Sequence, residues 1–225
     1  MRFISALFAF VFAATMFAQT SIPRPEHPRP QFVRDTWVNL NGTWTYTFDF
    51  GESGTARGLS ASKGFDAKIT VPFCPESKLS GVEHKDFINA MWYHRTIDVP
   101  ATWQGKKILL NFGAVDYFST IYINGEFAGR HWGGSSSFSI DITRFVKAGE
   151  KADVVVWVKD DLRSGEQTGG KQCTNYFSSG CSYTRVTGIW QTVWMEAVAP
   201  TGLKEVYVKP DLDNSCFILE PKFHA

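Results

Sequence analysis

The chain has 225 residues and a formal net charge of +1, with 23 lysines and arginines against 22 aspartates and glutamates. This balance excludes the strongly basic surface that is typical of proteins that bind nucleic acids. The composition is 44% hydrophobic and 15% aromatic, which suits a single large β-sheet domain with a ring-rich core.

The first residues are typical of an export signal. Met1 and Arg2 precede an almost wholly apolar segment at residues 3–17, which is followed by Ala18 and polar residues. A segment this short predicts a signal peptide at residues 1–18, and a retained membrane anchor is the alternative. We therefore expect an exported protein, periplasmic or extracellular, that is not attached to a membrane after cleavage.

A proline-rich lead at residues 19–36 is expected to form an extended linker before the main domain at residues 37–200. The first strand of that domain has an alternating pattern. Trp44, Tyr46, Phe48 and Phe50 fall on one face, which predicts a buried aromatic face, and Asp49 falls on the other. The Asn-Gly pair before this strand, at residues 41–42, favours a turn over a glycosylation site.

The middle of the chain consists of short apolar or alternating segments separated by turns. The turn Asn124–Gly125 has the residues of a two-residue hairpin that needs positive φ at both positions. The continuous apolar run at residues 153–159 predicts a central strand covered on both faces. The pattern as a whole predicts an all-β sandwich, with strands at residues 69–71, 91–99, 107–112, 118–123, 126–131, 139–143 and 153–159.

A long polar loop follows at residues 163–180. Cys173 and Cys181 flank its second half and are the pair most suited to a disulfide, with free buried thiols as the alternative. The sequence has no Cys-x-x-Cys motif, so we expect neither a metal nor a cofactor. The paired Asp160 and Asp161 before the loop fit a solvated sheet edge better than a calcium site.

The stretch after this loop reads as a turn followed by a strand. Gly188 can adopt positive φ, and β-forming residues continue from Ile189 to Trp194, with Trp190, Thr192 and Trp194 on one face. Arg185 precedes the turn, where a sheet edge faces solvent or a ligand. Further strands are expected at residues 203–209 and from residue 216 onward.

These motifs, taken together, resemble the N-terminal sugar-binding domain of family 2 glycoside hydrolases, which include β-galactosidases, β-glucuronidases and β-mannosidases. The resemblance covers roughly residues 37–198 and rests on several ordered motifs. The matching residues are Leu40, Asn41, Gly42 and Trp44; Trp92, Tyr93, His94 and Arg95; Asp116, Asn124, Gly125, Gly129, His131, Gly133, Gly134, Phe138, Asp141 and Thr143; and Arg185, Thr187, Gly188, Ile189, Trp190 and Val193.

The resemblance implies a jelly-roll β-sandwich of the galactose-binding-like kind, followed at residues 201–225 by the first strands of an immunoglobulin-like domain. It also implies a loop that borders a sugar pocket, with Tyr183 and Arg185 at its rim. The family places an aspartate three residues before the position of Arg185, and this chain has Ser182 there, which puts a direct aspartate–sugar contact in doubt.

The other site residues have competing interpretations. Arg185 either contacts the ligand or holds the loop by pairing with a carboxylate such as Asp116. Trp132, in the glycine-rich stretch, either stacks on sugar or packs in the core or against another domain.

The functional expectation is a non-catalytic sugar-binding domain of an exported glycosidase. Retaining hydrolysis needs two carboxyl groups about 5–5.5 Å apart, and none of the acidic residues stands in the family's catalytic context, which lies in a (β/α)₈ barrel. We therefore expect no catalytic residue here, and two partners: a β-glycoside and the barrel of a longer enzyme. A free-standing carbohydrate-binding module and a structural interaction domain are the alternatives.

Overall fold

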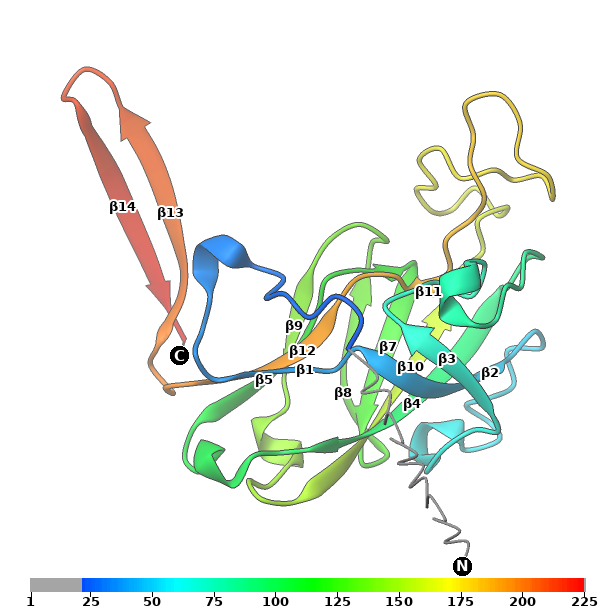
Figure 1. Cartoon of the computed structure of the whole chain (residues 1–225), viewed down its shortest axis with the longest axis horizontal. Helices are drawn as coiled ribbons and strands as arrows, with labels where there is room; N and C mark the ends of the chain where they lie inside the picture. Colours follow the sequence, from blue (N-terminus) through cyan, green and yellow to red (C-terminus); the bar gives the residue numbers. More distant parts are fainter. Residues whose placement is uncertain (1–21, 225) are drawn as a thin grey trace, which may run out of the picture.

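The computed structural model describes residues 22–224, and these fold almost entirely into β-strands joined by loops (Figure 1). The expected signal peptide at residues 1–18 lies outside the described residues. Five short 3₁₀ turns interrupt the loops: η1 (Pro30–Phe32), η2 (Leu59–Ala61), η3 (Lys78–Ser80), η4 (Ala101–Trp103) and η5 (Thr143–Phe145).

Two antiparallel sheets form the sandwich. The six-stranded sheet has the order β3 (Ala67–Val71), β2 (Gly42–Phe48), β4 (Ala90–Asp98), β10 (Lys151–Lys159), β7 (Phe118–Ile123) and β8 (Glu126–Trp132). The four-stranded sheet has the order β1 (Trp37–Asn39), β12 (Val193–Val198), β5 (Lys107–Phe112) and β9 (Phe138–Asp141). This architecture confirms the predicted all-β jelly-roll sandwich.

Two smaller two-stranded sheets complete the fold. β11 (Gly188–Ile189) pairs with β6 (Val115–Asp116) at one end of the sandwich. β13 (Leu203–Asp211) pairs with β14 (Cys216–Phe223) in a hairpin that projects from the sandwich (Figure 1).

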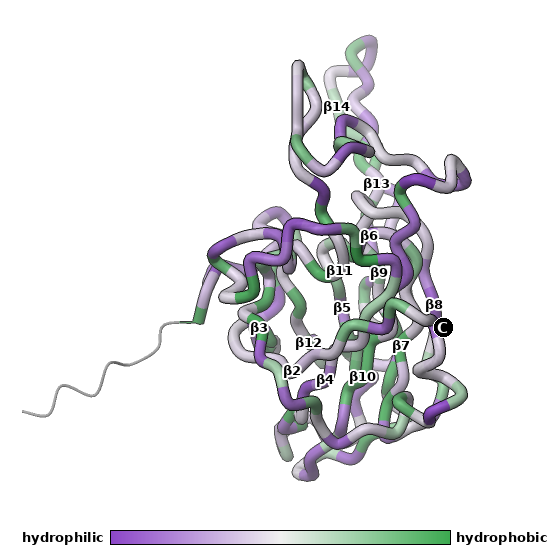
Figure 2. The backbone as a smooth tube through the Cα atoms, turned by 90° about the vertical axis from the view of Figure 1, so that its right-hand side faces the viewer, coloured by the Kyte–Doolittle hydropathy of each residue, from purple (hydrophilic) through white to green (hydrophobic). Residues whose placement is uncertain are grey.

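The core lies between the two main sheets. Alternate residues of β10 point inward, and Val154, Val156 and Val158 are fully buried. They share the core with Leu110 and Phe112 of β5, which are also fully buried. The hydropathy of the chain follows this layout, since β10 and β7 carry much of the apolar sequence (Figure 2). Burial of these aliphatic chains provides the main stabilisation of the sandwich.

Two local predictions are confirmed. Asn124 and Gly125 have φ of 52° and 85° and connect β7 to β8, as the hairpin pattern requires. β10 is central, between β4 and β7.

Two other predictions are wrong. The expected single strand from Ile189 to Trp194 is two strands, because the chain leaves β11, bends at residues 190–192 and enters the other sheet as β12. The first strand ends at Phe48, so Phe50 lies beyond it and is 53% exposed. Asp49 is buried instead, where it accepts hydrogen bonds from Trp92 Nε1 at 2.8 Å and from Gly54 N at 2.9 Å.

Candidate functional site

The loop at residues 161–187 leaves the end of β10 and returns to β11, and it protrudes from one end of the sandwich (Figure 1). We call this the loop end. Three elements meet at its base: β6, β11 and the segment that carries Glu76. The pairing of Gly188 with Asp116 fixes the point at which the loop rejoins the fold. The geometry at this base decides which side chains the loop can present to a ligand.

Asp116 holds the loop through a glutamine. Gln172 Nε2 donates to Asp116 Oδ2 at 2.7 Å, and Gln172 Oε1 accepts from Val186 N at 2.7 Å. Gly134 passes so close that a Cβ there would lie 2.3 Å from Asp116 Oδ1. Asp116 is only 5% exposed, so its position is that of a buried support and not of a rim residue.

Two further acids hold the other side of the loop. Thr187 Oγ1 donates to Asp160 Oδ2 at 2.7 Å, and Gln167 Nε2 donates to Asp160 Oδ1 at 2.6 Å. Thr187 N donates to Glu76 Oε2 at 3.2 Å. Asp160 is therefore buried and bonded, and the expected solvated edge is wrong at this residue. We call Glu76, Asp116 and Asp160 the acidic anchor.

The acidic anchor favours protonated carboxyls. Burial, reinforced by the charges of Asp160 and Glu76, raises the pKa of Asp116 to about 7, against the opposing hydrogen bond from Gln172. Burial likewise raises the pKa of Glu76 to about 7, although hydrogen bonds from Thr187 act to lower it. The pKa of Asp160 is also raised by burial. Three carboxyls brought together in a low-dielectric site resist ionisation together.

Arg185 is a second support. It is 3% exposed, and its NH1 donates to the carbonyls of Asn175 at 2.7 Å and Cys173 at 3.3 Å. Its NH2 donates to the carbonyl of Lys85, and the guanidinium lies 4.2 Å from the ring centroid of Phe87. The expected ion pair with Asp116 is not formed. Arg185 pins the loop through backbone oxygens, and a rigid fork with five donors is suited to that task.

Tyr183 is the one residue of this loop that was predicted at the sugar pocket and is exposed, at 50%. Its backbone pairs with an earlier segment of the same loop. Tyr183 N donates to Lys171 O at 2.9 Å, and Cys173 N donates to Tyr183 O at 2.8 Å. Tyr176 and Phe177 are also exposed on the loop, at 49% and 80%. The loop thus presents three aromatic rings above a buried polar base.

The expected disulfide between Cys173 and Cys181 is not formed. All four cysteines are free thiols, with Cys173 buried and Cys181 exposed. The Cys173 thiol instead donates to Phe177 O at 3.5 Å.

Trp132 belongs to a different surface. It is the last residue of β8, and it packs edge-on against Phe118 with ring centroids 5.2 Å apart. Arg130 lies over its indole at 5.0 Å, and the ring is 54% exposed. The structure therefore does not bring Trp132 together with the anchored loop, but places it on the outer face of the six-stranded sheet.

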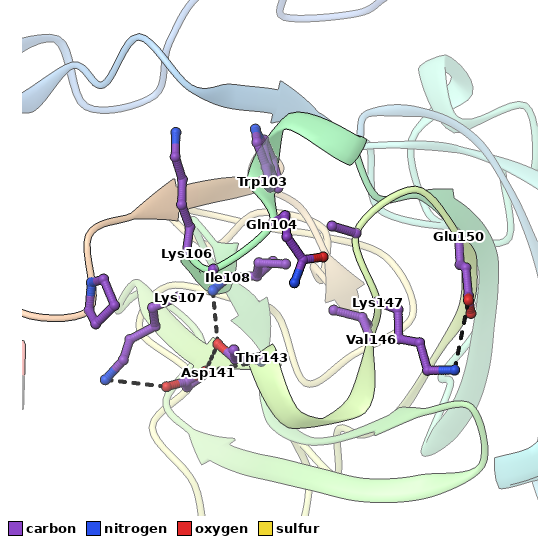
Figure 3. Close-up of a pocket in the computed structure, with 13 residues that line it drawn as sticks. Trp103, Gln104, Lys106, Lys107, Ile108, Asp141, Thr143, Val146, Lys147 and Glu150 are labelled. Atoms are coloured by element: carbon purple, nitrogen blue, oxygen red, sulfur yellow. Dashed lines mark hydrogen bonds and ion pairs between the residues drawn. The ribbon is translucent and has the colours of Figure 1, made fainter.

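The largest of the cavities characterised in residues 22–224 lies at the opposite end of the sandwich. It has a volume of about 760 Å³ and is lined by residues of η4, η5 and the start of β5, among them Trp103, Lys106 and Ile108 (Figure 3). Four of its charged side chains form ion pairs, Lys147 with Glu150 at 3.7 Å and Lys107 with Asp141 at 3.5 Å.

Asp141, one of the two acids that line this cavity, is unsuited to proton donation. Although burial acts to raise the pKa of Asp141, hydrogen bonds from Thr143 and the charge of Lys107 outweigh it and keep that pKa below its usual value. We place the candidate site at the loop end, because Asp116, Tyr183 and Arg185 are brought together there by the anchored loop.

Residues 22–224 hold no group of three or more His, Cys, Asp or Glu side chains placed to bind a metal ion. Within the same part of the chain, no helix has the length and apolar character needed to cross a bilayer.

Sequence reasoning missed Glu76, Asp160 and Gln172 as parts of the site. Gln172 lies within the long polar loop at residues 163–180, where one polar residue is not distinguished from its neighbours by any local pattern. Glu76 stands 111 residues from its partner Thr187, and a contact at that separation leaves no local pattern. Asp160 could have been suspected, because it ends a buried strand and precedes a long loop.

Comparison with known proteins agrees with this geometry. Residues 38–195 match the family described as glycosyl hydrolases family 2, sugar binding domain. A β-galactosidase of Thermoanaerobacter pseudethanolicus is 28% identical over 170 residues, which cover 74% of this chain and 20% of that protein. A β-glucuronidase of Streptococcus agalactiae is 28% identical over 124 residues, covering 55% of this chain and 20% of that protein.

The solved structures include a β-glucuronidase of Ruminococcus gnavus with a TM-score of 0.69 and 24% identity. The match covers 86% of this chain and 34% of that one, and it shows a shared fold. The described fold is that of a jelly-roll β-sandwich with a loop anchored at one end. More particularly, the chain belongs to glycosyl hydrolase family 2, and residues 38–195 form its sugar-binding domain. The chain spans about a fifth of the length of these curated relatives.

Proposed function

We propose that this chain is the sugar-binding part of an exported enzyme that hydrolyses a β-glycoside with retention. Its relatives are named as a β-galactosidase and as β-glucuronidases, which supports a β-galactoside or a β-glucuronide as the substrate. The apolar segment at residues 3–17 supports export. N-terminal sequencing of the secreted protein tests that point, and a start near residue 19 is expected.

The observation that carries the proposal is the division between the anchored base and the exposed rings of the loop. The acidic anchor and Arg185 are each at least 94% buried, whereas Tyr183 is 50% exposed. A sugar that approaches the loop therefore meets the phenol of Tyr183, which offers both a ring face and a hydroxyl. The buried supports keep that ring in place without touching the sugar.

Catalysis is assigned to residues outside this chain. Retaining hydrolysis needs one carboxylate as nucleophile and one carboxylic acid as proton donor, both open to the sugar. Asp116 and Glu76 have the raised pKa of a proton donor, but their oxygens hold the loop and the side chains are buried. We propose that the family's barrel supplies both catalytic groups.

The hairpin of β13 and β14 supports a longer protein. One of its faces is charged, with ion pairs Lys209–Glu220 at 2.5 Å and Lys222–Glu205 at 2.8 Å. The paired residues of its other face are all apolar and mostly exposed: Val206, Val208, Pro210, Phe217, Leu219 and Pro221. An isolated hairpin of this kind is marginal in water. We propose that it begins the immunoglobulin-like domain that the family resemblance implies.

The test is an assay of the full-length gene product with p-nitrophenyl β-galactopyranoside and p-nitrophenyl β-glucuronide. One of the two is expected to be hydrolysed, and the 225-residue chain alone is expected to hydrolyse neither. Tyr183→Ala is expected to lower kcat/KM about tenfold, or about 1.4 kcal/mol, chiefly through KM. Tyr207→Ala, which removes a ring that is 58% exposed on the hairpin, is the matched control. If the full-length product hydrolyses neither substrate, the proposal is wrong.

A further inference from the structure

The outer face of the six-stranded sheet is aromatic where a sandwich usually carries polar residues. Antiparallel register places Phe118 opposite Trp132, and Tyr122 opposite Phe127. Trp157 of β10 lies on the same face, since its neighbours Val156 and Val158 point into the core. None of these five rings is part of the buried core between the sheets. We call the five the ring face.

The five rings are connected in one series, in which a sixth ring, Trp92 of β4, links Trp157 to Tyr122. The centroid of Trp132 lies 5.2 Å from that of Phe118, which lies 5.6 Å from that of Trp157. Trp157 lies 6.2 Å from Trp92. Tyr122 continues the series, at 6.1 Å from Trp92 and 6.3 Å from Phe127. Phe127 and Trp132 lie opposite Tyr122 and Phe118, which are four residues apart on β7, so the series extends about 13 Å along the sheet.

The fold covers only part of this series. Gly54 lies over Trp92 so closely that a Cβ there would be 2.1 Å from the indole nitrogen, and Trp92 is fully buried. The same cover does not extend to the other end of the face. Phe127 and Trp132 are 53% and 54% exposed, while Phe118, Tyr122 and Trp157 are half-buried. The ring face is therefore in contact with water, chiefly through Phe127 and Trp132 at its two ends.

The open part of the face combines rings with charged hydrogen-bond donors. The guanidinium of Arg130 lies 5.0 Å from the centroid of the Trp132 ring. Lys159 borders Phe118 on the neighbouring strand and pairs with Glu52 at 2.8 Å. Every large apolar group that this face exposes is a ring. That chemistry suits a sugar chain, because the C–H face of a pyranose packs on an aromatic ring and its hydroxyls accept from charged donors.

We propose that the ring face is a second carbohydrate-binding surface, which holds several units of an extended β-linked glycan by stacking. A chain of β-linked pyranoses presents flat faces at intervals, and the sheet exposes one ring at each end of the series, Phe127 and Trp132. Between these ends, neighbouring rings meet edge to face, at 72° for Phe118 with Trp132 and 74° for Tyr122 with Phe127. The surface is distinct from the anchored loop and does not depend on Tyr183. It would hold the enzyme on a polymer while a single unit occupies the active centre.

The test is affinity electrophoresis of the 225-residue chain, freed of its signal peptide, through gels that contain hydroxyethyl cellulose, xylan or galactan. At least one of these β-linked polymers is expected to retard the protein, and α-linked dextran is expected not to. The double variant Phe127→Ala/Trp132→Ala is expected to bind at least tenfold more weakly. Phe50→Ala is the matched control, because this ring is 53% exposed at the other edge of the sheet, and it is expected to bind as the parent does.

Three results would overturn the inference. The first is no retardation by any of the three β-linked polymers. The second is equal retardation of the parent and the double variant. The third is a parent that self-associates in sedimentation while the double variant does not, which would make the ring face a protein interface. Melting temperatures of all variants verify folding. Small p-nitrophenyl glycosides cannot span the ring face, so the two proposals succeed or fail separately.

Discussion

The substitution Asp116→Asn tests whether the acidic anchor is held in its protonated form. Asparagine keeps the shape of the side chain, and its amide oxygen can still accept from Gln172. What it removes is the ability to ionise. Asp116 is 5% exposed and lies near two other carboxyls, so this ability is expected to be a liability to the fold at high pH.

The sign and size of the expected change in stability follow from the pKa of Asp116. The pKa of Asp116 is raised by burial to about 7, from the ordinary value of 3.8. The folded state therefore prefers the protonated acid. The stabilisation from this preference is complete below about pH 4 and is lost as the pH rises through 7. Between pH 5 and pH 8 the parent is expected to lose about 2–3 kcal/mol through this residue, and the variant is not.

The assay is thermal unfolding of the parent and the variant at pH 5 and pH 8. The melting temperature of Asp116→Asn relative to the parent is expected to rise by roughly 5–10 °C between these two pH values. Asp141→Asn is the control, because hydrogen bonds from Thr143 and the charge of Lys107 lower the pKa of that acid despite its burial. Its stabilisation is present above about pH 4, so this variant is expected to be destabilised equally at both. Parallel melting of Asp116→Asn and the parent would refute the reasoning.

Three further substitutions test local geometry. Gly188→Ala is expected to destabilise the domain by more than about 2 kcal/mol in urea, because φ is 74° and the new Cβ would lie 2.1 Å from the hydroxyl oxygen of Tyr93; a loss below about 0.5 kcal/mol would contradict this. Arg185→Lys is expected to speed hydrogen exchange of the backbone amides at residues 173–176 while β10 stays protected. Unchanged exchange at residues 173–176 would show that Arg185 does not hold this part of the loop in place. Asn124→Ala is expected to lower the free energy of unfolding by about 1–2 kcal/mol, because the side chain accepts from Asp153 N and donates to Phe145 O, both at 2.9 Å. An unchanged free energy of unfolding would contradict this expectation.

Local chemistry explains which parts of the fold could be predicted. The hairpin at Asn124–Gly125 follows from two residues that tolerate positive φ, and it needs no distant partner. The central position of β10 follows from its continuous apolar run. In both, neighbouring residues specify the outcome, so the sequence pattern and the structure agree.

Predictions failed where a distant segment decides the outcome. The residues from Ile189 to Trp194 all favour strands, but the pattern does not encode that the chain changes sheets within them. Asp49 looked solvent-facing by alternation, yet Trp92 and Gly54 reach it from elsewhere and bury it. Alternation describes one strand and says nothing about what packs against its end.

In the candidate site, too, local sequence identified a residue but distant contacts decided its role. The sequence singled out Arg185, but a charged residue before a turn fits both a ligand contact and a buried support. Its donors meet the backbone carbonyls of residues 173, 175 and 176 and of Lys85, and backbone oxygens carry no sequence signature. A role of this kind becomes visible only once the loop has been folded around the side chain.

The separation of buried supports from exposed rings also bears on Ser182, which stands where the family resemblance implies an aspartate. The loop owes its position to Asp116, Asp160 and Glu76, and none of their bonds involves residue 182. We therefore expect a change at residue 182 to leave the position of the loop unaltered. If a sugar binds at this loop as we propose, the missing aspartate affects recognition and not architecture, and the exposed Tyr183 beside it is the residue at which to look for a compensating contact.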